Sequence, residues 1–190
     1  MTLSQKDVAR LLQDPSVQNR AETAGKVATQ LDHQLTPAER KIAHDIISLM
    51  TRDAAVLVRE ALADNLRHIA EVPHDVAMRL AQDVESVSLP MLESSNAFSD
   101  EDLIEILKGS SETKQAAIAQ REVVSEKLSE AIVTSGGEKA VASLMGNEGA
   151  RVNEKMLNTA LDRFQKSELV QVPMVNRAKF PVPVAERLVT

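Results

Sequence analysis

The stretch Phe98–Leu107, FSDEDLIEIL, carries the signals of a complete helix start. Ser99 is typical of a helix cap, and Glu101 and Asp102 place negative charge in the first turn, where the helix dipole favours it. The apolar Phe98 before the cap is typical of a hydrophobic staple. Apolar residues then follow at helical spacing, at Leu103, Ile106 and Leu107.

Four other stretches repeat this order of apolar residue, cap and helix. The caps fall at Pro73, Ser99, Ser125, Asn153 and Pro181, with spacings of 26, 26, 28 and 28 residues. A fixed period of this length is typical of stacked helical repeats. The residues before the caps are Val72, Phe98, Val124, Val152 and Phe180. Two inward columns are predicted, Leu80, Ile106, Ile132, Ala160 and Leu188, then Ala81, Leu107, Val133, Leu161 and Val189.

A first helix is predicted before each capped helix, and its signals are less regular. Its inward column is Leu66, Leu92, Ile118, Gly146 and Met174, with Leu144 and Met145 replacing the glycine. Because proline is costly inside a helix, Pro90 and Pro173 are expected in a first turn or at a break, which makes these helices short. Gly109 and Gly136 are expected to end helices in the left-handed conformation, and Gly149 to take a positive φ in a turn.

These patterns predict an all-α fold, an α-α superhelix of helical repeats without a β-sheet. Residues 1–190 are expected to form a single helical domain, with an N-terminal helical part over 1–55 and repeats of about 26–28 residues over 56–190. Within the first part, helices are expected over 3–13, from Pro15, and from Thr36, which can form a capping box with Glu39. Because Thr190 falls within a helix, the repeats are expected to continue beyond it, or a second copy to cover the open face as a homodimer.

The composition narrows the classes of function. The net charge of −6 and the 2% of aromatic residues argue against nucleic-acid binding, which needs a basic surface and often base stacking. No stretch resembles a signal peptide or a membrane-spanning helix, and the chain contains no Cys. A cytoplasmic protein without membrane contact is therefore expected.

Several short motifs agree in order and spacing with a known family. They are Leu12–Ser16, Val58–Ala63, Arg79–Asp83, Leu89–Ser94, Phe98–Leu103, Ala117–Arg121 and Asn147–Ala150. Over nearly the whole chain, the sequence resembles the alphaproteobacterial family known as domain of unknown function 2336. The units also resemble HEAT repeats and leucine-rich-repeat variants. The resemblance implies an α-helical repeat protein of the bacterial cytoplasm, longer than this chain, with no activity, cofactor or catalytic residue to transfer.

Two groups of charged residues are candidates for a partner-binding surface. Arg121 and Arg177 both lie four residues before a cap, where they could bind an acidic partner or cap carbonyls at the end of the first helix of their own repeat. Asp100, Glu101 and Asp102 could bind a basic partner or serve only the helix dipole.

The His-Asp dipeptides His44-Asp45 and His74-Asp75 are the only residues that suggest catalysis. Helical metal-dependent phosphohydrolases use such pairs with further ligands, yet the spacings of His33 and His68 do not fit such a site. The helix dipole accounts for Asp75 at a helix start, and Asp45 is expected on the solvated side of a helix. No nucleotide-binding loop and no Ser-His-Asp order with supporting motifs is present. No catalytic, metal or cofactor residue is therefore assigned. The favoured function is a non-enzymatic scaffold or regulatory adaptor for a protein partner, and the alternative is a metal-dependent hydrolase.

Overall fold

The computed structural model describes residues 13–31, 35–178 and 180–189, and this part of the chain is all-α. It contains one isolated parallel bridge, Val124 with Ala150, and no sheet, which confirms the predicted fold class. The helix predicted over 3–13 falls almost entirely outside the described residues. The helices are α2 (Val17–Gln30), α3 (Pro37–Met50), α4 (Val56–Leu66), α5 (His74–Ala81), α6 (Glu85–Ser94), α7 (Asp100–Gly109), α8 (Glu112–Ala119), α9 (Glu126–Ser135), α10 (Glu138–Gly146), α11 (Glu154–Arg163), α12 (Glu168–Val175) and α13 (Val182–Val189).

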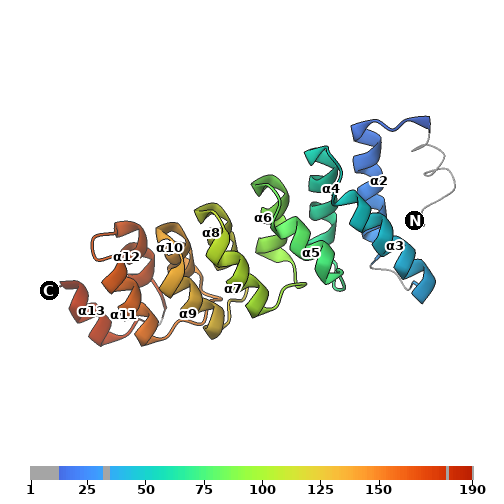
Figure 1. Ribbon diagram of the computed structural model, residues 1–190. Helices are drawn as coiled ribbons and strands as arrows, with labels where there is room; N and C mark the ends of the chain where they lie inside the picture. Colours follow the sequence, from blue (N-terminus) through green and yellow to red (C-terminus); the bar gives the residue numbers. More distant parts are fainter. Residues whose placement is uncertain (1–12, 32–34, 179, 190) are drawn as a thin grey trace. The chain divides into compact units, whose positions relative to one another are not determined.

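The chain divides into two compact units, unit 1 (Met1–Phe98) and unit 2 (Ser99–Thr190). In unit 2 the helices form two rows (Figure 1). One row contains the first helices of successive repeats, with α10 packed between α8 and α12. The other contains the capped second helices, α7, α9, α11 and α13, each in contact with the next. This arrangement lets each helix bury an apolar face that a single repeat would leave exposed.

Unit 1 uses the same arrangement. Helix α4 packs between α2 and α6, and α3 packs against α5. Within unit 1, α2 and α3 thus pack as a first helix and a second helix do, although their spacing along the chain differs from that of the later repeats. The predicted boundary at residue 55 and the prediction of a single domain stay predictions.

The predicted inward columns form the core. Of the residues seven and eight after the caps, Leu80, Ile106, Ile132 and Ala160 are buried, as are Ala81, Leu107, Val133 and Leu161. Leu188, near the end of the chain, is half-buried. Leu144 and Met145 are buried while Gly146 is exposed, which confirms the predicted replacement. Each fully buried Leu or Ile side chain stabilises the fold by about 1.5–3 kcal/mol relative to an exposed one.

The helix starts also follow the sequence. Thr36 forms the predicted capping box with Glu39, and Ser99 forms one with Asp102. The side chains of Ser125 and Asn153 accept hydrogen bonds from backbone N–H groups of the first turn. Five apolar residues precede the five predicted caps. Val72, Phe98 and Val124 are buried, whereas Val152 and Phe180 are half-buried.

The prediction for the two prolines was wrong. Pro90 lies inside α6 and Pro173 inside α12, each as the sixth residue of its helix. A proline there removes one backbone hydrogen bond, while the residues that follow the two prolines, Met91 and Met174, are buried in the core. The helices are nevertheless short, at 10 and 8 residues.

The prediction of left-handed glycines was also wrong. No glycine in the described part of the chain has a positive φ. Gly136 follows α9 with φ −70° and ψ 155°, an extended conformation open to any residue. A side chain at Gly136 would instead meet the carbonyl oxygen of Ile132 at 2.6 Å, so the residue is small because space is lacking.

Candidate functional site

The three predicted acidic residues of α7 all take part in bonds within unit 2. Asp102 accepts hydrogen bonds from the backbone N–H and the hydroxyl of Ser99, at 2.8 and 2.7 Å. Asp100 accepts one from the hydroxyl of Ser125 at 2.5 Å, and Glu101 is paired with Lys127. The hydrogen bond from Lys127 lowers the pKa of the Glu101 carboxyl.

The next pair of second helices, α9 and α11, is joined by similar bonds. The side chain of Asn153 donates to Glu126 at 2.8 Å, as Ser125 does to Asp100. Lys155 pairs with Glu130 at 3.1 Å. Polar side chains of consecutive second helices therefore join α7 to α9 and α9 to α11, and the predicted acidic patch is the first step of this series.

Arg177 caps a helix end, but of a different helix from the one predicted. Its guanidinium donates to backbone carbonyls at the end of α10 and in the turn that follows, at distances of 2.9–3.2 Å: Leu144, Met145, Asn147 and Ala150. Helix α10 belongs to the preceding repeat, not to the repeat of Arg177. Arg177 thus joins two repeats.

Arg121, predicted to be equivalent to Arg177, lies in a different environment. Burial lowers the pKa of its guanidinium, and the charge of Asp100 opposes this shift. At the end of α8, the carbonyls of Ala119 and Arg121 receive hydrogen bonds from the Asn147 side chain, at 2.8 and 2.7 Å. Asn147 therefore joins its repeat to the preceding one as Arg177 does. The charge of Asp100 therefore acts on Arg121, whereas Arg177 lies at the end of α10.

The two His-Asp dipeptides contact one another. His44 Nε2 of α3 lies 3.0 Å from Asp75 Oδ1 at the start of α5, and His44 Nδ1 lies 3.9 Å from Asp45. Burial would raise the pKa of Asp75, but the hydrogen bond and charge of His44, with two backbone N–H groups, outweigh it and lower the pKa. Among the described residues, no group of three or more His, Asp or Glu is placed to hold a metal ion, and His33 lies outside them.

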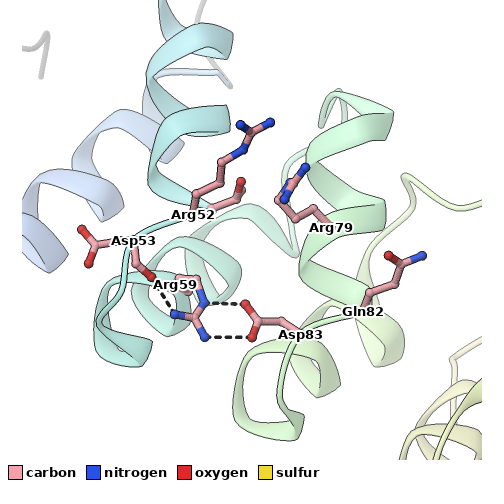
Figure 2. Close-up of a pocket in the computed structure, with 7 residues that line it drawn as sticks. Arg52, Asp53, Arg59, Arg79, Gln82 and Asp83 are labelled. Carbon is pink, nitrogen blue, oxygen red and sulfur yellow. Dashed lines mark hydrogen bonds and ion pairs between the residues drawn. The ribbon is translucent and has the colours of Figure 1, made fainter.

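Unit 1 contains a pocket that the sequence did not predict, here called the arginine pocket. It has a volume of about 320 Å³ and is lined by Thr51, Arg52, Asp53, Arg59, Arg79, Gln82 and Asp83. Figure 2 shows that these residues come from the turn after α3, from α4 and from the end of α5.

Two ion pairs hold the acidic residues of the arginine pocket. Arg59 donates through Nε and Nη2 to the Asp83 carboxylate at 2.5 and 2.9 Å, and through Nη1 to the Asp53 carbonyl at 2.6 Å (Figure 2). Arg20 of α2 binds the Asp53 carboxylate in the same forked geometry, at 2.8 and 2.9 Å. Each carboxylate is therefore neutralised by one guanidinium, a geometry that arginine favours.

Asp53 should make unit 1 sensitive to acid. The hydrogen bonds from Arg20 lower the pKa of Asp53 against the effect of burial, and the Ala55 N–H adds to the shift. A carboxylate with a lowered folded pKa stabilises the fold above its unfolded pKa of about 3.9, and the stabilisation is lost as the pH falls through the folded pKa. Urea unfolding should show Asp53→Asn less stable than wild type by about 1 kcal/mol at pH 6, since solvent screens the pair, with the difference shrinking below pH 3. Asp64→Asn, at an exposed position of α4, is the control and should be as stable as wild type at pH 6.

Unit 2 contains a second opening, here called the first-helix groove. It has a volume of about 560 Å³ and runs across the row of first helices, lined by Ala116, Gln120, Lys139, Ala142, Ser143, Glu168, Leu169, Val172 and Pro173. Leu169 and Val172 of α12 are exposed by 53% and 55%, which is unusual for large apolar side chains that lie next to one another on a helix. Because Pro173 has no N–H, the Leu169 carbonyl also lacks the helical hydrogen bond that residue 173 would donate.

The site residues that were not predicted differ in how clearly the sequence marks them. Leu169 and Val172 were not predicted as site residues, because valine and leucine on one face of a helix predict burial in the core. Arg52 follows the end of α3 and Arg79 lies in the last turn of α5, and a basic residue is common at either position. The family motifs Val58–Ala63 and Arg79–Asp83 contain the Arg59–Asp83 pair, so a search for an arginine and an acid about one repeat apart would have found it.

Comparison with known proteins agrees with the resemblance. Within the described residues, no helix has the length and apolarity needed to cross a membrane. No curated protein and no solved structure matches this chain. Residues 87–190, more than half of the chain, match the family described as uncharacterised protein conserved in bacteria (DUF2336). The chain therefore belongs to this family of uncharacterised bacterial proteins.

Proposed function

We propose that this protein is a non-enzymatic scaffold or regulatory adaptor that binds a protein partner through the first-helix groove. The observation that supports the proposal is the exposure of Leu169 and Val172 in a groove whose lining also includes two small residues, Ala116 and Ala142. Grooves of this kind accept the apolar face of an amphipathic helix. Lys139 and Glu168, which also line the groove, offer charges of both signs to the polar edges of such a helix.

The bonds between repeats support this choice of surface. Asp100, Glu101 and Arg177 already bind neighbouring repeats, so a partner would have to displace those contacts. Leu169 and Val172 can be covered without breaking any polar bond, and covering them removes apolar surface from water. The cytoplasm is the proposed location of this scaffold.

Leu169→Ser combined with Val172→Ser should weaken partner binding by about tenfold or more, because each side chain loses about 1 kcal/mol of burial. The measurement is affinity capture from source-cell lysate, followed by titration of the retained protein. Val123→Ser is the matched control, since Val123 is 64% exposed in the same unit and does not line the groove. Equal retention of a partner by wild type, the double variant and Val123→Ser would mean that the partner binds elsewhere on the protein. A second copy of the chain as the retained partner would indicate the homodimer.

A metal-dependent hydrolase is the second candidate, and the contact between His44 and Asp75 is the observation that favours it. Metal analysis of the purified protein tests it. Stoichiometric metal that is lost on His44→Ala, in a variant of unchanged helicity, would support the hydrolase over the scaffold.

A further inference from the structure

The arginine pocket has more positive charge than its own acids neutralise. Asp53 is held by Arg20 and Asp83 by Arg59, each through two nitrogen atoms. Arg52 and Arg79 also line the pocket, both are exposed, and neither side chain has a partner among the described residues. Two guanidinium charges are therefore available at one opening.

We propose that the arginine pocket binds a phosphate monoester in its dianionic form. A phosphate group on an organic hydroxyl carries a charge of about −1.5 to −2 at pH 7, which matches the two available guanidinium charges. A carboxylate would neutralise only one of them. The planar forks of arginine also fit phosphate oxygens in pairs, which lysine does not.

The other lining residues suit this ligand. Gln82 is exposed, and its side-chain amide, which has no partner among the described residues, can donate to a phosphate oxygen. Arg59 is held by Asp83 and by the Asp53 carbonyl, so its charge is already neutralised and it forms a fixed wall of the pocket. A volume of about 320 Å³ lies at the small end of ligand pockets, which suits a single phosphate group and a short attachment.

A simpler explanation would treat each arginine separately. Arg79 lies in the last turn of α5, and Arg52 follows the end of α3, positions where the helix dipole favours a cation. That explanation predicts basic residues at helix ends but not their meeting at one pocket. Figure 2 shows both side chains at the same opening, Arg79 from α5 and Arg52 from the turn after α3. The two explanations differ in what happens when phosphate is added.

Titration of the full chain with inorganic phosphate at pH 8 and constant ionic strength tests the proposal, followed by ³¹P NMR or calorimetry. Wild type should bind phosphate more tightly than acetate. Arg52→Gln and Arg79→Gln should each weaken phosphate binding by about tenfold or more, the usual effect of losing a charged hydrogen bond. Arg151→Gln, at an exposed arginine of unit 2, should bind as wild type does. Because the two pocket variants are independent, either one suffices if the other folds poorly.

Equal phosphate binding by wild type and both pocket variants would overturn the proposal, as would acetate binding equal to that of phosphate. Free O-phosphoserine and a short phosphoserine peptide then identify the source of the phosphate group. Tighter binding of the peptide than of the amino acid indicates a phosphorylated protein, and equal binding indicates a small phosphorylated molecule. None of these measurements involves the first-helix groove, so the result is independent of the proposed function.

Discussion

Gly149→Ala is expected to lower the free energy of unfolding by about 2–3 kcal/mol, as forced overpacking usually does. A Cβ at Gly149 would lie 1.9 Å from the carbonyl oxygen of Glu122 and 3.0 Å from its carbonyl carbon. Both atoms belong to the backbone, so no side-chain rotation relieves the clash. The two segments that meet here are held by hydrogen bonds from Val124 N–H to the Gly149 carbonyl and from Arg151 N–H to the Val124 carbonyl, at 3.3 and 3.0 Å.

Gly109→Ala is the matched control for this prediction. Apart from Gly109, its chain neighbours and the nearby backbone of α7, no atom lies within 4 Å of a Cβ built at Gly109, the last residue of α7. Because alanine favours a helix over glycine by up to about 1 kcal/mol, this variant should be as stable as wild type or slightly more stable. Urea unfolding followed by circular dichroism measures both. Equal losses in the two variants would show that space beside Glu122 is not what requires glycine at position 149.

The glycines show where sequence reasoning fails. A glycine near a predicted helix end suggests a left-handed residue, because that is the usual local reason for its presence. Here the reason for Gly149 is not local, since it depends on a carbonyl in the loop of the preceding repeat. The sequence contains no signal for how closely two loops approach. Only the packed arrangement of the repeats reveals it.

The core was predicted well for the opposite reason. Burial in a helix recurs every three to four residues, so columns such as Leu107 and Ile132 can be seen in the sequence itself. The caps Ser99, Ser125 and Asn153 are equally local, since each acts on the turn that follows it. The fold class therefore follows from patterns shorter than one repeat.

The candidate sites could be predicted from the sequence in part, less well than the core and better than the glycines. The arginine pocket combines side chains from the turn after α3, from α4 and from the end of α5, so its charge balance depends on which arginine binds which acid. The sequence shows the residues but not the pairing. The same holds for Asn147, whose amide reaches carbonyls of the preceding repeat.

Arg177→Met is expected to lower the free energy of unfolding by about 3 kcal/mol. Methionine keeps most of the apolar stem but cannot donate to the four carbonyls that the guanidinium now binds, at the end of α10 and in the following turn. Hydrogen bonds that involve a charged group contribute about 1.5–3 kcal/mol. The Leu144 and Asn147 carbonyls keep backbone donors without Arg177, from the N–H groups of Asn147 and Ala150, so the desolvation cost falls on the Met145 and Ala150 carbonyls. Arg177→Lys should recover only part of the loss, because one ammonium group cannot replace both donor nitrogens of the fork.

Arg151→Met is the control, since Arg151 is an exposed arginine of the same unit. Urea unfolding of the three variants, combined with the partner titration, separates the two roles first considered for Arg177. A loss of stability with unchanged partner affinity in the folded protein would assign Arg177 to holding two repeats together. Wild-type stability with weakened partner binding would instead place Arg177 on the partner surface and would contradict the expectation drawn from its four carbonyl contacts. The first outcome is expected, because a guanidinium that already donates to the end of α10 and to the following turn can reach a partner only by giving up those bonds.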